Sequence, residues 1–498
     1  MKKLKFIILS FLFLFLLCLI FFFIKGNKFD FEKIVNTHSL NKNLVYNLSI
    51  DGFICPYDKK NSLFYYSNNS IPNSFTFVSD YDVSYRIYDS DDNLYKIIVY
   101  DDSYYDLISL YIDTVPIVNI YDMDIIKPYS NLNSLSQFNL SDFDETDYFN
   151  YIGVQITNFN RDSSVKSFSS LGSMSVRGAS STFFDKKSYK LDLKKQFGFN
   201  NVSKDRVWVL DALYTDASKI RNKLSSDIWN LFNDNQSINN DLHSEFVELF
   251  IDNEYMGLYV LKEKVDRSVY SCLDDGLLLK ATSHLLDDKI NKFLSNPHIV
   301  DDEILNFEIK KNNKEILDNF IDNMFVYYSS NSNYGLTSRI YNIDNFINYK
   351  LFVALISGED NVSSNQYYSI CGVDDKILIT PWDMDLTWGL YWNLNTFLHS
   401  SFEYDKDFNK EWLDQNIINR MDTKTIEKFK DRYWELRRNV ITMDTINSYL
   451  DSYKELLVNS GAASRDSERW YEYDVENEIE TIREWAGRRI QFLDEYFS

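Results

Sequence analysis

The chain has 498 residues, 45% of them hydrophobic and 25% charged, which is enough apolar material for more than one buried core. It carries 52 Lys plus Arg against 74 Asp plus Glu, a formal net charge of −22. No basic stripe recurs along it, which argues against nucleic-acid binding, because phosphate neutralisation needs clustered Lys and Arg.

The N-terminus begins with lysines, which are followed by the unbroken apolar run Phe6–Ile24. As a helix this run would be about 28 Å long, close to the thickness of a bilayer core. We therefore expect a cytoplasmic stub and signal-anchor transmembrane helix in residues 1–26. The lysines before the run predict a single-pass membrane protein whose C-terminal part lies outside the cytoplasm.

Residues 27–148 predict a β-rich extracytoplasmic domain made of short strands and polar turns. The clearest alternation of apolar and polar residues runs from Tyr85 to Tyr100, and the polar stretch Asn131–Tyr148 is a plausible linker. Asn-x-Ser sequons, for example at Asn47, Asn139 and Asn361, are expected by chance in a chain so rich in Asn and Ser.

A loop of small residues marks the next block, about 149–275. The strand Leu171–Arg177 ends in Arg177-Gly-Ala-Ser-Ser, and Lys190 lies on the strand Ser188–Leu193 that follows. Backbone N–H groups and a guanidinium suit phosphate, and Lys190 on a facing strand would reach the same group. An ordinary β-turn explains the Arg-Gly pair equally well.

Helix and hairpin signals continue beyond this loop. An amphipathic helix is predicted over 217–232, and a hairpin over 245–262 that ends at Glu263, a residue that suits either an ion pair or a nucleotide contact. An apolar helix from Asp344 to Ser357 is expected to end at Gly358 and to deliver Asp360 to the surface of the core. Residues 411–498 are mostly helical in pattern.

The stretch Gly358–Gly389 reads as loop, strand, turn, strand and loop. Because a hairpin brings its two ends together, Asp360 and Asn365 in the first loop should meet Asp383 and Asp385 in the second. In protein kinases a D-x-x-x-x-N catalytic loop, a hairpin and a metal-binding Asp follow in this order. The spacing therefore predicts a metal site, although no His-Arg precedes Asp360 and no Phe-Gly follows Asp383, which excludes an ordinary kinase.

Several segments resemble the spore coat protein H (CotH) family of atypical protein kinases. They are SMSVRGASS with KKSYKLDL, WVLDALYTDASKIRNKLSSDIW, VELFIDNEYMGLYVLKEKVD, GEDNVSSNQYY and ITPWDMDLTWG. The resemblance covers roughly residues 150 to 498. It implies an α+β fold in which residues 149–498 form a divergent, two-lobed kinase-like domain with a helical C-terminus.

The resemblance also implies an activity: phosphorylation of serine on secreted or coat proteins, with ATP and Mg²⁺ as cofactors. Asp360 matches the family's catalytic-loop acid, and Asp383 its metal-binding Asp. Asn365 and Asp385 stand at positions that suit metal ligation, and Arg177 and Lys190 match the segment expected to meet phosphates.

Two other functions stay open at this point. Asp383 and Asp385 lie beside Trp382, Trp388 and Trp392, a composition that also suits a glycan hydrolase with acid–base carboxylates. Alternatively, the protein is a non-catalytic, membrane-tethered scaffold that uses its β-rich domain as a binding surface.

Overall fold

The structure is a computed structural model. It describes residues 31–68, 71–72, 74–91, 93–122, 152–157, 167–178, 180–199, 205–233, 240–265, 275–297, 303–330, 336–391, 408–419 and 421–498. The described chain divides into two compact units. One contains residues up to Ser173 together with Glu248–Met256, and the other contains Met174–Val247 with Gly257–Ser498.

The first unit is built from two small sheets. One has the order β4-β5-β9-β8-β7 with β1 beside β9, and the other has the order β3-β2-β6. The strands are β1 Ser39–Leu40, β2 Asn47–Ile50, β3 Phe53–Ile54, β4 Tyr57–Asp58, β5 Leu63–Ser67, β6 Thr76–Val78, β7 Ser84–Asp91, β8 Leu94–Tyr100 and β9 Tyr104–Asp113. Alternating residues such as Ile97, Val99, Ile108 and Leu110 point inward and form the core with Phe53 and Tyr66.

Seven strands form a closed barrel in the order β10-β11-β12-β13-β14-β16-β15. They are β10 Ile117–Asp122, β11 Ile152–Thr157, β12 Ser167–Arg177, β13 Ser188–Phe197, β14 Asp205–Asp211, β15 Ser244–Ile251 and β16 Glu254–Glu263. β10 pairs in parallel with β15, from Ile117 opposite Glu248 to Ile120 opposite Ile251. Closure leaves no free sheet edge in the barrel.

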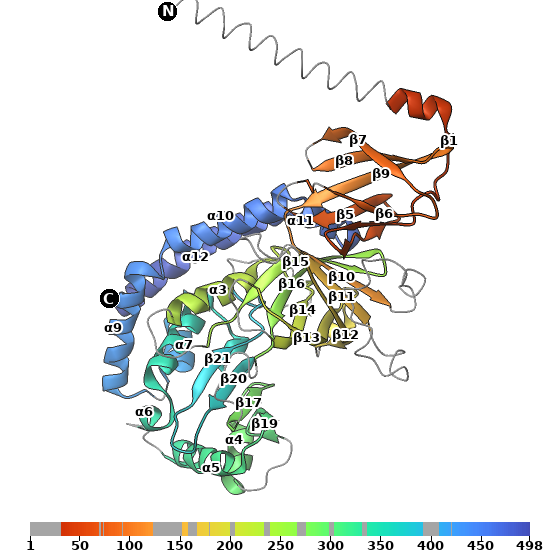
Figure 1. The fold of residues 1–498 in the computed structure, drawn as a ribbon. Coiled ribbons are helices and arrows are strands. Elements are labelled where there is room, and N and C mark those ends of the chain that lie inside the picture. The colour runs from red at the N-terminus through yellow and green to blue at the C-terminus, as the bar shows by residue number, and fades with distance from the viewer. Residues whose placement is uncertain are drawn as a thin grey trace, which may run out of the picture. The chain divides into compact units, whose positions relative to one another are not determined.

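Besides some of the barrel strands, the second unit contains a five-stranded sheet and the helices given below. The sheet order is β18-β19-β17-β20-β21, with β17 Leu277–Ala281, β18 Glu303–Ile304, β19 Phe307–Lys311, β20 Gln366–Ile370 and β21 Leu378–Pro381. The helices are α3 Arg221–Asn233, α4 Asp287–Ser295, α5 Lys314–Ser329, α6 Thr337–Ile340, α7 Ile343–Ile356, α8 Lys410–Leu413, α9 Thr423–Asn439, α10 Met443–Asn459, α11 Ala462–Arg469 and α12 Val475–Phe497. α10 and α12 run side by side (Figure 1).

Lys186, Lys219 and Asp466 form a buried lysine cluster. This cluster fixes α11, which carries Asp466, against the rest of the second unit. All three side chains are 0–1% exposed, and the Asp466 carboxylate lies 2.5 Å from Lys186 Nζ and 3.7 Å from Lys219 Nζ. The same carboxylate accepts hydrogen bonds from Leu258 N at 2.8 Å and Tyr473 Oη at 2.9 Å. The cluster is therefore sealed from water and satisfied internally.

The predicted fold class requires two corrections, although the fold is mixed α+β. First, the strands within residues 152–263 belong to a closed seven-stranded barrel, which the predicted fold class did not include. One of its strands, β10, comes from the region 27–148 that was predicted to be β-rich. Periodicity detected the strands but carried no information about their partners, because the β10–β15 pair joins residues more than a hundred positions apart.

The second correction concerns the transmembrane helix. Among the described residues no helix is long and apolar enough to cross a bilayer. α7 is apolar but has only 14 residues, about 21 Å, while the longer α12 carries charges throughout. The prediction of a single-pass membrane protein with an N-terminal span is therefore corrected, and Phe6–Ile24, on which it rested, lies outside the described residues, as does the predicted linker Asn131–Tyr148.

Candidate functional site

The β20–β21 hairpin brings the two predicted loops together. β20 and β21 are antiparallel, with Gln366 opposite Pro381. Asn365 immediately precedes β20, and the backbone N–H of Trp382, just after β21, donates to its carbonyl at 2.9 Å. Asp383 and Asp385 follow directly, so the predicted convergence of the loops is present.

α7 delivers Asp360 to this end of the hairpin. The helix is capped by Asn342, whose side chain accepts from Asn345 N, and it ends at Ser357 in a left-handed conformation, φ 50°. The left-handed residue at the end of this helix is therefore Ser357 and not Gly358. A Cβ at this glycine would lie 2.9 Å from Asn361 Oδ1, so the close approach of that side chain is what requires glycine here.

Three carboxylates, Asp360, Asp383 and Asp385, form the acidic cluster. Burial and then the Asp383 charge raise the pKa of Asp385 well above its usual range, and Thr215 Oγ1 donates to Asp385 Oδ2 at 3.2 Å. Burial also raises the pKa of Asp360, which Asp383 raises further and His284 opposes. His284 Nε2 lies 3.3 Å from Asp360 Oδ1. A bound cation would relieve the crowding of like charges.

Cations from the barrel and the sheet face this cluster. Lys262 Nζ on β16 lies 2.5 Å from Asp211 Oδ2 on β14, and 4.7 Å from the centre of the Trp382 ring. Arg177 at the end of β12 lies 5.6 Å from the same ring. Burial opposes ionisation of Asp211, but the Lys262 and Arg177 charges outweigh it and lower its pKa.

Lys280 on β17 is a third cation near the acids. Burial lowers its pKa, and the Asp383 carboxylate raises it in part. Its Nζ lies 5.9 Å from the ring of Tyr367, the residue opposite it on β20. Lys280 therefore links the acidic cluster to the face of the five-stranded sheet.

The loop after Arg177 depends on its glycine. Gly178 has φ +111°, and a Cβ there would lie 1.8 Å from Ser181 Oγ, so no other residue fits this turn. This steric requirement explains the Arg-Gly pair without a ligand. Arg177 nevertheless lies over the Trp382 ring, beside the acidic cluster.

Lys190 lies on β13, two strands away from Lys262 on β16. It lies opposite Val209 on β14, and Val209 lies opposite Lys262 on β16. Directly paired residues of antiparallel strands share a face, so Lys190 and Lys262 are on one face of the barrel, two strand spacings or about 10 Å apart. The structure thus brings Arg177, but not Lys190, next to Trp382.

A cavity of about 570 Å³ extends from this face. Its lining is mostly charged and cationic: Asp192, Asp205, Arg206, Val207, Lys264, Val265, Leu278, Lys310, Lys311 and Tyr367. Tyr367 also packs edge-on against Trp382, with ring centres 5.7 Å apart. Through these two rings the cavity adjoins the acidic cluster, and its lining has a net positive charge in a strongly acidic chain.

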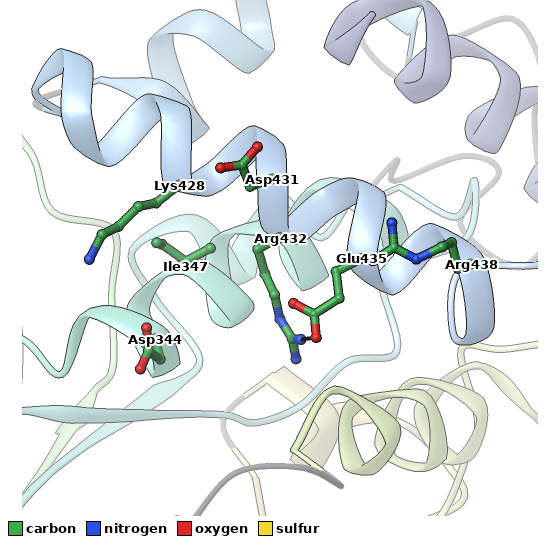
Figure 2. A pocket seen from close by; sticks show the side chains of 7 residues that line it. All are labelled: Asp344, Ile347, Lys428, Asp431, Arg432, Glu435 and Arg438. Carbon is green, nitrogen blue, oxygen red and sulfur yellow. Dashed lines mark ion pairs between the residues drawn. The ribbon is translucent and has the colours of Figure 1, made fainter.

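A second cavity, of about 460 Å³, lies between the first half of α7 and α9 (Figure 2). Arg432 is fixed there, because it pairs with Glu435 at 2.8 Å and donates to Asn348 Oδ1 at 2.9 Å. The lining includes Asp344, near the start of α7, whereas Asp360 follows the other end of that helix. This cavity is therefore separate from the acidic cluster.

α3 supports the loop that carries Asp383 and Asp385. Arg221, fully buried, forms an ion pair with Asp216 and donates from Nε to Thr387 O at 3.1 Å. The indole N–H of Trp388 donates to Ser225 Oγ at 2.9 Å. The conformation of this loop is thus set by a helix more than 150 residues earlier in the chain.

The acidic cluster fits a magnesium–nucleotide complex. No group of three or more His, Cys, Asp or Glu side chains suited to a metal ion occurs among the described residues. Mg²⁺ in nucleotide sites, however, uses one or two carboxylates together with phosphates and water. Asp383 and Asp385 are such a pair, since burial and then the Asp383 charge raise the pKa of Asp385, and Asn365 lies beside them as an amide oxygen donor.

Sequence reasoning missed several residues around the acids: Asp211, Thr215, Lys262, Lys280, His284 and Asn361. Lys262 lies at the end of a predicted strand, where a charge in an otherwise apolar pattern is its only local signal. Asp211 lies at the end of β14, a strand that was not predicted. Glu263, for which two roles were open, forms an ion pair with His243 at 3.0 Å.

Comparison with known proteins places the chain in a family. Residues 174–493 match the family model described as CotH kinase protein. No curated protein matches the sequence. Since the match covers more than half of the chain and spans the whole site described above, the protein belongs to the CotH kinase family, whose members are kinase-like.

Proposed function

We propose that this protein is a Mg²⁺-dependent kinase that transfers the γ-phosphate of ATP to a serine hydroxyl of a protein substrate. The observation that carries the proposal is the acidic cluster of Asp360, Asp383 and Asp385, which faces the cations Arg177, Lys262 and Lys280. Phosphoryl transfer consists mainly of positioning and charge neutralisation, and both parts are supplied by such an arrangement.

Each acid has a separate role in this proposal. Asp360 accepts the proton of the serine hydroxyl or orients that hydroxyl, and its raised pKa makes it a better base than an ordinary aspartate. Asp383, Asp385 and Asn365 are the residues that would hold the metal ion. When bound, Mg²⁺ neutralises charge on the phosphates and orients them.

The cations and the larger cavity supply the rest of a nucleotide site. Arg177 on β12 and Lys262 on β16 both lie beside Trp382, where they would neutralise the phosphates. Asp211 holds Lys262 in place through an ion pair. The 570 Å³ cavity beyond Tyr367 has room for a nucleoside. Lys190, on the same face of the barrel as Lys262, would contact the outer part of the ligand.

A glycan hydrolase is less consistent with the same residues. Trp382 is 4% exposed and Trp388 is fully buried, while Trp392 lies outside the described residues. A sugar ring needs an open aromatic face on which to stack, and neither Trp382 nor Trp388 offers one. No feature of the described residues favours the scaffold over the kinase.

The test is phosphate labelling with γ-tagged ATP, followed by mass spectrometry of the modified residues in the protein itself and in added serine-containing peptides. Asp383→Ala should reduce labelling by about a thousandfold, since metal-ion charge stabilisation contributes several kcal/mol. Labelling by the variant at the wild-type rate would contradict the assignment.

The matched control is Asp374→Ala. Asp374 lies exposed in the turn at the opposite end of the same hairpin, so its loss removes a carboxylate without touching the acidic cluster. This variant should label at the wild-type rate, and an equal loss in both variants would point to a general effect of charge or folding.

A further inference from the structure

We propose that Asn361 is a positioning residue that sets the distance between the two loops of the metal site. The inference rests on the proposed function, because it concerns how the chain holds the residues assigned to the metal. It is carried by the hydrogen bonds of one buried side-chain amide.

The Asn361 amide joins the two loops directly. Its Nδ2 donates to Asn365 O at 3.0 Å and to Trp382 O at 2.9 Å. A side-chain amide has two N–H bonds, so both are used, one for each loop. One carbonyl belongs to Asn365, a proposed metal ligand, and the other belongs to Trp382, which directly precedes the proposed ligand Asp383.

Asn361 is itself held rigidly. It is 1% exposed, and its own carbonyl accepts a hydrogen bond from Tyr349 Oη, on α7, at 2.6 Å. Its N–H donates to Gly358 O at 3.1 Å. The amide is therefore fixed to the end of α7 before it reaches the loops.

The backbone that it holds is unusual. Asn365 has φ 47° and Asp383 has φ 55°, both in the left-handed region that residues other than glycine rarely adopt. Such conformations persist where the surroundings determine them. The hydrogen bond from Trp382 N to Asn365 O and the two bonds from Asn361 are the contacts that hold these turns together.

Asn361 thus acts through Asn365 and Asp383 and need not touch a ligand. Outer residues that orient metal ligands typically change metal affinity by 10- to 100-fold when they are replaced. We expect loss of the amide to let the two loops separate and to weaken metal binding more than it weakens the fold.

The experiment is a Mn²⁺ titration followed by electron paramagnetic resonance, with the full chain and a non-hydrolysable ATP analogue. Asn361→Ala should weaken Mn²⁺ binding by about tenfold or more. Asn361→Leu keeps approximately the size of the side chain but removes both N–H donors without adding a charge, so it should have the same effect and serves if the alanine variant does not fold.

The matched control is Asn348→Ala, measured together with the melting temperature of each protein without metal. Asn348 is also fully buried, and its side-chain amide also donates to a backbone carbonyl, Phe232 O, at 2.8 Å. It lies elsewhere, however, where α7 contacts α3 and α9. The Asn348→Ala variant should lower the melting temperature as Asn361→Ala does, but its Mn²⁺ affinity should stay within twofold of that of the wild type.

Mn²⁺ affinity within twofold of wild type in both Asn361 variants would overturn the positioning role and leave the proposed function standing. An equal weakening in Asn348→Ala would also overturn it, because the effect would then follow stability alone. If the wild-type protein shows no nucleotide-dependent Mn²⁺ binding, the proposed function fails and the inference fails with it.

Discussion

The acidic cluster and the buried lysine cluster are two groups of charges in the same unit, and they are built in opposite ways. Around Asp466 two lysines, a backbone N–H and a tyrosine hydroxyl satisfy one carboxylate, and nothing is open to water. Around Asp383 three carboxylates crowd together, and the Asp360 side chain is 34% exposed.

The contrast separates a structural charge cluster from one that is prepared for a ligand. Complete internal pairing lowers the pKa of Asp466 even though burial acts against it. Burial, together with the like charge of Asp383 and too few compensating partners, raises the pKa of Asp385 and Asp360. A carboxyl group with a raised pKa in a partly exposed site is typical of functional residues.

The largest stability effect is expected at the lysine cluster. Asp466→Ala leaves Lys186 and Lys219 buried without their carboxylate, and breaking a buried pair in this way costs about 3–5 kcal/mol. Urea unfolding followed by tryptophan fluorescence measures the loss. Asp383→Ala, which instead removes a crowded charge, should leave the unfolding free energy unchanged or raise it.

Asp451→Ala is the control for this prediction. Asp451 pairs with Arg483 at 2.7 Å but is 67% exposed, and pairs of this kind contribute at most about 1 kcal/mol. Similar losses for Asp466→Ala and Asp451→Ala would mean that the buried cluster is not the structural element described here.

A pH effect of intermediate size is expected at Lys219. Burial lowers the pKa of Lys219 to about 7, against 10.5 for an ordinary lysine. Between these values the unfolded chain binds one proton more than the folded chain, so the stability of the folded state rises with pH. Between pH 7.5 and 9 the gain relative to Lys219→Met should be about 2 kcal/mol.

This difference is obtained from denaturant unfolding of both proteins at the two pH values. Titrating groups that do not contact Lys219 contribute equally to the two proteins and cancel. A constant difference across this range would show that Lys219 keeps its charge in the fold.

The smallest effect is expected at His284, beside the acidic cluster. His284 lowers the pKa of Asp360, so His284→Gln should raise that pKa and move the acid limb of the pH–rate profile for labelling to higher pH. The labelling rate of the variant should fall by less than about tenfold at pH 6 and should not change measurably at pH 8. His243→Gln, which removes a histidine paired with Glu263, should leave the profile unchanged.

The elements near the site were predictable because their signals are local. The two strands of a hairpin were predicted within Gly358–Gly389, and they occur at Gln366–Ile370 and Leu378–Pro381. The convergence of the two loops follows from the hairpin alone. The chemical roles of Asp360, Asn365, Asp383, Asp385, Arg177 and Lys190 stay predictions.

What the sequence could not show depends on contacts between distant residues. Closure of the barrel by β10 and β15, and the pairing of Asp211 with Lys262, leave no periodic signal. The apolar helix was predicted to end on Gly358, but the left-handed residue at its end is Ser357. Gly358 is needed for another reason, which is the close approach of the Asn361 side chain. Local rules place an element, and the neighbours of that element decide its details.

The position of Asn361 in an Asn-Val-Ser sequon has a practical consequence for producing the protein. A eukaryotic secretory pathway adds a glycan to such an asparagine before the chain has folded. The attached sugar would replace one of the two N–H bonds that hold the loops, at a residue with 1% exposure and no room for a glycan. Recombinant protein should therefore come from a host without this modification, since glycosylated material would lack an assembled site.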